Sequence, residues 1–379
     1  MFRRIPFALA LTAFIFAQAQ QNPEPLKTEQ PKPAAAQAPP AQTPASTPGP
    51  APAHASAAPA DLQQKPIKVQ VNEVIVPVTV TDEKNKFVSN LDANDFRIFD
   101  EGREQKLHFF SREHSQPVVV GFLIDLSNAT RLHWKNYQDA ATELALNLLP
   151  GDNPKYSAYL ITYGNDAEVA VDTTHDPEMI VDKLRKAKPG GGAALFDAIY
   201  LACHKRHVVD GEPYDPRRVI IIIGDGHDTA SKKGLDEVLE LAQRNLITIY
   251  GMSTVAFGFT SEGSKDLARL AEETGGRVEY PLQNLYADVS GYLSRPSDEG
   301  NYAYQVGTGA YAAELSNGIF RAVNNIAGEV TTQYILRYTP DTDPKTEGKT
   351  FRNIRVAVNL PNVKVRARKG YYPQSLDNR

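Results

Sequence analysis

Two side chains that could bind a ligand follow a strongly apolar run in the sequence. Residues 117–124 are all apolar or glycine, and the polar residues Asp125 and Ser127 come directly after them. Such a run, rich in β-branched residues, predicts a strand that is buried on both faces. In an open α/β sheet, ligands bind at the loops that leave the carboxyl ends of the strands. The sequence therefore places a candidate site at Asp125 and Ser127, either a working site or the remains of one.

Three other patterns could carry chemistry, but each has a simpler interpretation. Residues 189–192 precede a predicted helix and could bind an anion, but they lack the Lys-Ser/Thr of a P-loop, which favours a plain turn. His204 and His207 lie three residues apart, yet no third zinc ligand is near them in the sequence. Ser127 beside Asp125 suggests hydrolysis, but the segment has no G-x-S-x-G motif. An enzyme is therefore the less favoured hypothesis.

Alternating strands and helices are predicted on both sides of the candidate site in the sequence. The spacing of apolar residues predicts helices at 134–149, 177–187, 194–206, 235–246, 265–274 and 315–330. Further apolar or alternating runs predict strands at 155–162, 167–172, 219–223, 247–252 and 277–280. This alternation predicts an α/β fold at 116–331, with a doubly wound, mainly parallel sheet. Within it, residues 287–313 are rich in Gly and Tyr without a clean period and are predicted to form a long loop.

Residues on both sides of the α/β segment alternate with the period of a β-strand. Residues 67–112 predict three strands, the third of them around Leu107 and Phe109, and residues 332–373 predict further strands. Three strands are too few for an independent β domain. We therefore predict one small β-sandwich built from both ends of the chain, with the α/β domain inserted between them.

The first residues of the chain predict export. Arg3 and Arg4 precede an apolar segment at 7–17, and an A-x-A cleavage pattern follows, so residues 1–19 are predicted to be a signal peptide. Residues 20–66 are rich in proline and alanine and are predicted to be a disordered linker. We therefore expect a periplasmic or extracellular protein with no transmembrane helix in the mature chain.

The composition of the chain limits its partners. The formal net charge is −4, so the chain has no basic surplus that would indicate a nucleic-acid partner. Cys203 is the single cysteine, which excludes an intrachain disulfide, and its position in an apolar helix stripe predicts a buried side chain.

Several motifs together resemble von Willebrand factor A domains. They are DLSNA after the buried strand, GGGAALFDA at the start of a helix and IIIIGDGHD at the end of a later strand. The flanking segments VTDEKNKFVSNLDANDFRIFDEG, YILRYTP and VRARKGYYP are similar to the bacterial secreted VWFA-related family first recognised in acidobacterial genomes. The resemblance covers roughly residues 68–373.

The resemblance implies a metal-ion-dependent adhesion site, in which a DxSxS motif, a threonine and an aspartate bind a divalent cation, usually Mg²⁺. Asp125, Ser127 and Asp225 match three of these positions. Ala129 and Ala193 stand where the second serine and the threonine are expected. Because methyl groups cannot coordinate a cation and Mg²⁺ needs six oxygen ligands, tight Mg²⁺ binding is less expected here than in the family.

Other groups near these positions could replace the metal or extend the site. Two carboxylates in one cleft need a cation or hydrogen-bond donors, which His227, Lys232, Lys233 or the amides of Gly191 and Gly192 could provide. Asp228 and Thr229 lie close to Asp225 in the sequence and could contribute as well. The prediction is thus a binding site of Asp125, Ser127, Gly191, Gly192, Asp225 and Asp228, with Mg²⁺ as a possible cofactor.

The resemblance favours a protein-binding or adhesion module that recognises a protein or cell-surface ligand through a degenerate metal site. A structural or assembly protein of the cell envelope that binds no metal is the alternative. A metal-dependent hydrolase is the least favoured reading.

Overall fold

The computed structural model describes residues 73–112, 117–151, 153–204, 216–255, 262–282, 308–341 and 350–373. All of them belong to one compact unit, Lys68–Arg379. The predicted signal peptide, the predicted linker, His207 and residues 287–307 of the predicted loop lie outside the described residues. Where the structure describes the chain, no helix is long and apolar enough to cross a membrane.

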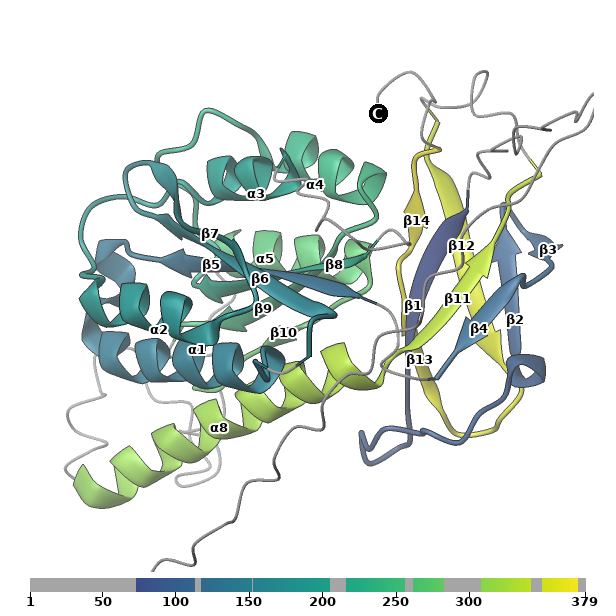
Figure 1. Cartoon of the computed structure of the whole chain (residues 1–379), viewed down its shortest axis with the longest axis horizontal. Helices are drawn as coiled ribbons and strands as arrows, with labels where there is room; N and C mark the ends of the chain where they lie inside the picture. The colour runs from purple at the N-terminus through teal and green to yellow at the C-terminus, as the bar shows by residue number, and fades with distance from the viewer. Residues whose placement is uncertain are drawn as a thin grey trace, which may run out of the picture. The chain divides into compact units, whose positions relative to one another are not determined.

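A six-stranded sheet forms the centre of the α/β segment (Figure 1). Its order is β10 (Val278–Glu279), β9 (Thr248–Ser253), β8 (Arg217–Gly224), β5 (Val118–Asp125), β6 (Tyr156–Tyr163) and β7 (Ala167–Thr174). All neighbouring strands are parallel except β6 and β7. The predicted mainly parallel sheet is therefore confirmed.

Helices cover both faces of this sheet, which gives two apolar cores. One core contains side chains of α1 (Trp134–Leu148), α2 (Pro177–Lys186) and α8 (Thr308–Thr332). The other contains side chains of α3 (Leu195–His204), α4 (Leu235–Arg244) and α5 (Glu262–Thr274). All eight residues of β5 are buried, and its Val, Phe, Leu and Ile side chains alternate between the two cores. Burial on both faces explains why this strand is an uninterrupted apolar run.

The N-terminal and C-terminal strands combine into two antiparallel sheets. The first has the order β13 (Lys364–Ala367), β1 (Val74–Thr81), β11 (Tyr334–Tyr338) and β4 (Phe109–Ser111). The second has the order β14 (Gly370–Tyr371), β12 (Arg352–Val358), β2 (Phe96–Asp100) and β3 (Arg103–Gln105). Apolar residues of both sheets form one shared core. Both ends of the chain thus build these sheets, as predicted, while the predicted domain boundaries stay predictions.

Two predicted elements differ in the structure. The predicted third strand at Leu107 and Phe109 is two short strands, β3 and β4, which pair with β2 and β11 in different sheets. The chain changes sheets here, and partly buried Leu107 packs on their shared core. In addition, α8 begins at Thr308, so residues 308–313 of the predicted loop are helical. This segment contains Ala310, Ala312 and Ala313, and alanine has the highest helix propensity.

A buried carboxylate joins the two sheets of terminal strands. Asp100 at the end of β2 has no exposed surface. Its Oδ1 accepts a hydrogen bond from Arg352 Nε at 2.9 Å, and its Oδ2 accepts hydrogen bonds from the hydroxyls of Tyr338 and Tyr371 at 2.9 and 3.0 Å. Tyr338 lies in β11 of the first sheet, and Tyr371 and Arg352 lie in the second. Because both carboxylate oxygens have donors, the cost of burying this charge is offset.

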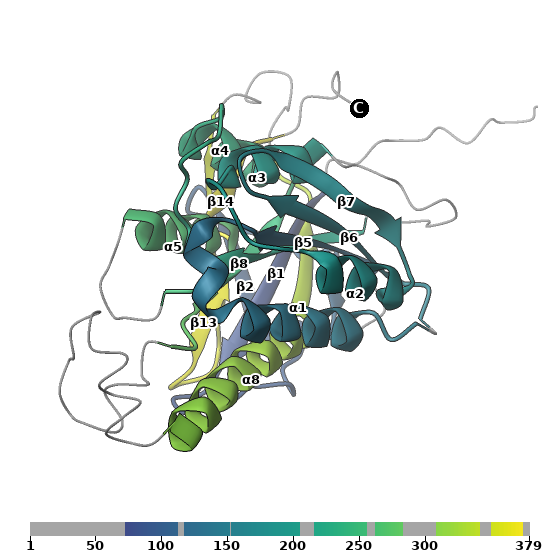
Figure 2. The ribbon, with the colours of Figure 1, turned by 90° about the vertical axis from the view of Figure 1, so that its left-hand side faces the viewer.

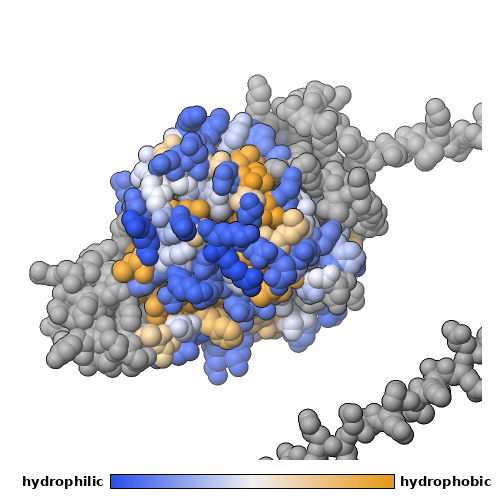
Figure 3. Space-filling model, turned by 60° about the vertical axis from the view of Figure 1, so that its left-hand side comes forward, coloured by the Kyte–Doolittle hydropathy of each residue, from blue (hydrophilic) through white to orange (hydrophobic). Residues whose placement is uncertain are grey.

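Hydrophobic residues on the face of the molecule in Figure 3 form small groups separated by hydrophilic residues. The large apolar side chains that are exposed include Leu132 in the segment after β5, Met179 in α2 and Phe320 in α8.

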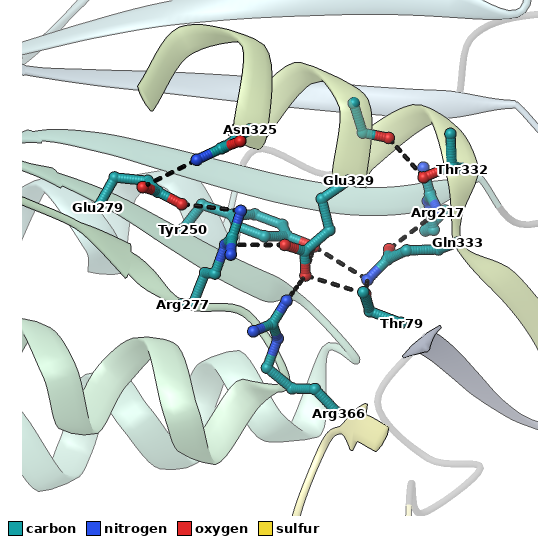
Figure 4. A network of polar contacts seen from close by, with 11 residues as sticks. Thr79, Arg217, Tyr250, Arg277, Glu279, Asn325, Glu329, Thr332, Gln333 and Arg366 are labelled. Atoms are coloured by element: carbon teal, nitrogen blue, oxygen red, sulfur yellow. Dashed lines mark hydrogen bonds and ion pairs between the residues drawn. The ribbon is translucent and has the colours of Figure 1, made fainter. Parts of the chain in front are cut away.

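A second buried carboxylate links the α/β segment to the terminal strands (Figure 4). Glu329 of α8 has no exposed surface. Its Oε2 lies 2.9 Å from Nε of Arg277, which precedes β10, and its Oε1 pairs with Arg366 of β13. The hydroxyl of Thr79 in β1 donates to Oε1 at 2.9 Å. One side chain of α8 thus contacts the residue before β10 and two terminal strands.

Gln333, which directly follows α8, extends this network. Its amide Nε2 donates to the Thr79 hydroxyl at 3.0 Å and to the Tyr250 hydroxyl at 2.9 Å. Its Oε1 accepts a hydrogen bond from Arg217, a buried residue at the start of β8, at 3.1 Å. The amino ends of the central strands are therefore joined by polar contacts to β1 and β13 of the terminal sheets.

We predict that Glu329→Gln lowers the free energy of unfolding by about 3 kcal/mol, because the neutral amide leaves Arg366 without this carboxylate and Arg277 with Glu279 alone in a largely buried setting. Urea denaturation followed by fluorescence measures the change. Glu314→Gln on the exposed face of the same helix is the matched control and should stay within about 0.5 kcal/mol of the native chain. Equal stabilities of the two variants would contradict the role assigned to Glu329.

Candidate functional site

Three loops meet at the edge where β5 and β8 end, which is viewed from the side in Figure 1 and faces the viewer in Figure 2. The Gly190 N–H donates to the carbonyl oxygen of Leu126 at 2.6 Å, and the Asn128 N–H donates to that of Gly191 at 3.1 Å. The Thr229 N–H donates to the carbonyl oxygen of Ala193 at 2.8 Å. The loops after β5, before α3 and after β8 are therefore held together by their backbones.

Asp125 lies at the bottom of this site and is 1% exposed. Its Oδ1 accepts a hydrogen bond from the Ser127 N–H at 2.7 Å, whereas its buried Oδ2 has no hydrogen-bond partner among the described residues. Gly224 faces it from β8, and a Cβ at Gly224 would lie 2.9 Å from the Asp125 Cβ and 2.3 Å from the Tyr163 hydroxyl oxygen. Only glycine therefore fits at the end of β8.

Burial raises the pKa of Asp125 to about 6. Hydrogen bonding to Ser127 acts in the opposite direction, and the nearby carboxylate of Asp225 raises the pKa further. The site thus contains a buried carboxyl group that is held without a cationic partner, and this is costly for its charged form.

Ser127 and Thr130 are both turned towards the backbone of their own loop. The Ser127 Oγ accepts a hydrogen bond from the Ala129 N–H at 3.3 Å and caps the short helix η2 (Asn128–His133). The Thr130 hydroxyl lies 3.0 Å from the carbonyl oxygen of Ser127 and 3.2 Å from that of Asp125, and it donates to them. Ser127 and Thr130 are buried, whereas Ala129 is exposed at the surface of the site.

Asp225 forms a close pair with His227. Its Oδ1 accepts the His227 N–H at 2.9 Å, and its Oδ2 lies 3.0 Å from His227 Nδ1. The Asp225 side chain is 14% exposed and that of His227 is 44% exposed. His227 is one of the residues predicted to compensate the charge of the carboxylates. It contacts both oxygens of Asp225, through its backbone N–H and its Nδ1.

Asp228 contacts the start of α3. Its Oδ2 accepts the Phe196 N–H at 2.9 Å, and its Oδ1 accepts the Ser231 N–H at 3.1 Å. The first N–H groups of a helix have no partner within the helix, so a carboxylate here satisfies one of them. Asp197 makes the reciprocal contact by accepting the N–H groups of Lys232 and Lys233, each at 3.1 Å. The geometry of Asp228 is that of a helix cap.

The glycine loop depends on a residue that sequence reasoning missed. Gly191 has a φ of +93°, which favours glycine, and a Cβ there would lie 2.8 Å from Asn165 Oδ1. The same Asn165 oxygen accepts the Gly192 N–H at 2.6 Å. Asn165 lies in the turn between β6 and β7, where a single polar residue between strands indicates no more than a turn. It nevertheless adds a side-chain hydrogen bond to the backbone contacts that hold this loop.

At the positions where the resemblance implies hydroxyl ligands, the structure has Ala129 and Ala193. The Ala193 N–H donates to Thr229 Oγ1 at 2.9 Å, so the Thr229 hydroxyl lies beside the residue that replaces the expected threonine. Of the other candidates, Cys203 is buried as predicted, and His204 Nδ1 lies 2.8 Å from the carbonyl oxygen of Tyr200 in its own helix.

Residues 120–287 match the family model of the von Willebrand factor type A domain. The chain contains a von Willebrand factor type A (VWA) domain. The match spans β5 to β10 and includes the three loops of the site. No curated protein matches the chain. The finer similarity to a secreted bacterial family stays a prediction.

Several solved structures are similar to this chain at low identity. A three-domain fragment of the type V pili tip protein Mfa5 from Porphyromonas gingivalis is 17% identical over 41% of this chain and 27% of that chain, with a TM-score of 0.27. BatB from Bacteroides thetaiotaomicron is 18% identical over 52% of this chain and 99% of that chain, with a TM-score of 0.35. Proximal thread matrix protein 1 from the mussel byssus, with a zinc-occupied MIDAS motif, is 15% identical over 45% and 42%, with a TM-score of 0.36. These similarities are too distant to carry an argument about function.

We predict that Asp125 makes the VWA domain less stable as the pH rises. Because its pKa of about 6 in the folded chain exceeds the ordinary value of 3.8, the folded state binds this proton more tightly than the unfolded state. The stabilisation is complete below pH 3.8 and is lost as the pH rises to about 6. The unfolding free energy of Asp125→Asn relative to the native chain should therefore increase by roughly 2.4 kcal/mol between pH 4 and 7.

Chemical denaturation with EDTA present measures this difference at each pH. Asp182→Asn, which replaces an exposed carboxylate in α2, corrects for the general effect of removing one negative charge. A difference between the native chain and Asp125→Asn that is the same at pH 4 and pH 7 would contradict the prediction.

Proposed function

We propose that the chain is an exported protein-binding module that contacts its partner through the three loops around Asp125. VWA domains are commonly protein-interaction modules, and this proposal assigns that role to the edge where β5 and β8 end. The observation that carries the proposal is the backbone bonding of three sequence-distant loops, which creates one pre-formed surface. Binding to a pre-formed surface avoids the entropy cost of ordering loops.

We further propose that this surface works without a tightly bound Mg²⁺, because the donor set does not fit the ion. Ala129 and Ala193 offer methyl groups, and both oxygens of Asp225 are engaged by His227. Mg²⁺ requires near-octahedral oxygen coordination. Within the described ranges, no group of three or more His, Cys, Asp and Glu side chains is arranged to hold a metal ion.

Exposed residues of the short helix η2 would form the contact. Leu132 is 74% exposed, and Asn128 and Ala129 are exposed beside it. A protruding apolar side chain next to an amide is suited to a protein surface, where apolar burial and hydrogen bonds act together. The partner in this proposal is therefore a protein or a cell-surface component.

The proposal does not include catalysis. A serine nucleophile needs a base within hydrogen-bond reach. The Ser127 hydroxyl is bonded to the Ala129 N–H, and no histidine is hydrogen-bonded to it in the part of the chain that the structure describes.

Export follows from the predicted signal peptide at 1–19, so the proposed location is the periplasm or the outside of the cell.

We predict that calorimetric titration of the native chain with millimolar Mg²⁺ or Mn²⁺ gives no saturable heat. The double variant Ala129→Ser/Ala193→Thr should acquire saturable binding, because it restores the two missing oxygens. Adding Asp125→Ala to that variant should abolish the binding. Saturable binding by the native chain that is lost in Asp125→Ala would refute a metal-independent surface.

We predict that Leu132→Glu lowers the capture of a cell-envelope partner by immobilised chain at least tenfold, because it places a charge at the centre of the contact. Quantitative mass spectrometry of the captured proteins measures the change. Met179→Glu is the matched control, since Met179 is 52% exposed in α2, away from the three loops. Equal loss in both variants, or in neither, would speak against this contact surface and would favour a structural role in the envelope.

A further inference from the structure

A groove lies where α4 and α5 meet the C-terminal strands, apart from the three loops around Asp125. Its volume is about 390 Å³, within the range of pockets that hold small ligands or single side chains. It is lined by Asp236, Leu239, Glu240 and Gln243 of α4, Arg269 and Glu273 of α5, and Phe351 and Tyr372 beside β12 and β14. The lining combines the VWA domain with residues from outside it, so the groove belongs to this chain's particular architecture.

Carboxylates exceed guanidinium groups around this groove. Arg269 pairs with both Asp236 at 2.8 Å and Glu273 at 3.1 Å. Glu240 pairs with Arg244 at 2.6 Å. Three carboxylates thus share two arginines, and one negative charge is left over. Glu240 is 45% exposed, so a further cation can reach it.

Gln243 adds an unused hydrogen-bonding group to the lining. The residue is 3% exposed, and its side-chain amide has no hydrogen-bond partner among the residues that the structure describes. Because Gln243 lines the groove, a ligand bound there can form a hydrogen bond with its side-chain amide. The amide oxygen is an acceptor that matches an N–H donor on the ligand.

Two aromatic rings form the wall on the side of the C-terminal strands. The rings of Phe351 and Tyr372 lie 5.3 Å apart between centroids, at 64° to one another. The guanidinium carbon of Arg244 already lies 4.2 Å from the centre of the Tyr372 ring. This wall therefore accepts a guanidinium on an aromatic face within the chain itself, which is a favourable cation–π contact.

We propose that this groove binds an arginine side chain of a partner protein. The carboxylates of Glu240 and Glu273 and the amide oxygen of Gln243 accept its N–H donors, and the ring of Phe351 packs against its planar end. Arginine fits better than lysine, because its fork of N–H donors can serve several acceptors at once and its plane stacks on a ring. The groove is separate from the three loops around Asp125, and the proposal does not depend on the contact assigned to them.

Nuclear magnetic resonance of the full chain tests this proposal with N-acetyl-arginine amide as the probe. We expect saturable shifts of the Gln243 side-chain amide signal at millimolar probe. N-acetyl-citrulline amide, which has the same shape without the charge, should produce no such shifts, and N-acetyl-lysine amide should bind at least threefold more weakly.

Variants distinguish binding in the groove from the general effect of removing negative charge. Glu240→Gln/Glu273→Gln should raise the dissociation constant of the arginine probe at least tenfold. Glu237→Gln, in the same helix but outside the groove, should leave it unchanged. Backbone amide spectra show whether each variant keeps its fold. Absence of shifts at Gln243, equal shifts with the citrulline probe, or equal affinity for lysine would each overturn the proposal.

Discussion

The attachment of the α/β segment to the terminal strands depends on the pairing of buried Glu329 with Arg277 and Arg366. The carboxylate lies on α8, and its partners come from the central sheet and from a C-terminal strand. A buried charge without its partners is far more costly than a buried apolar side chain. The helix, the sheet and the terminal strands must therefore take up their native positions together for this charge to be satisfied. Apolar packing alone specifies positions less sharply.

Three carboxylates are almost fully buried in the part of the chain that the structure describes, and their surroundings differ. Asp100 has one arginine and two tyrosine hydroxyls, and Glu329 has two arginines and a threonine hydroxyl. Asp125 has one backbone N–H, and its second oxygen has no partner in the described ranges. The first two are structural, since their neighbours balance the charge. Asp125 bears a local cost, because no cationic side chain balances its charge.

Much of the fold was predictable because it depends on patterns that repeat along the chain. The apolar run of β5 and the spacing in α1 reflect burial of whole faces, and burial is visible in a sequence. The change of sheet between β3 and β4 was not predictable. Each of these strands has only three residues, which is too short to show an alternating apolar pattern. Asn165 and Asp197 were missed for another reason. Each acts by accepting hydrogen bonds from a backbone that is distant in sequence, and a single polar residue leaves no periodic signal.

The way β1 pairs has a consequence for how the chain reaches its native state. Val78 is opposite Ala367 and Val74 is opposite Tyr338, so both neighbours of β1 come from the far end of the chain. Strands with such distant partners close slowly, because a long intervening segment must first be brought into place. During synthesis, β1 therefore presents two unpaired edges until the last strands arrive, and it is then open to pairing with another chain. The segment between β4 and β11 contains all six strands of the central sheet, so this sheet does not need the last strands and can form before them.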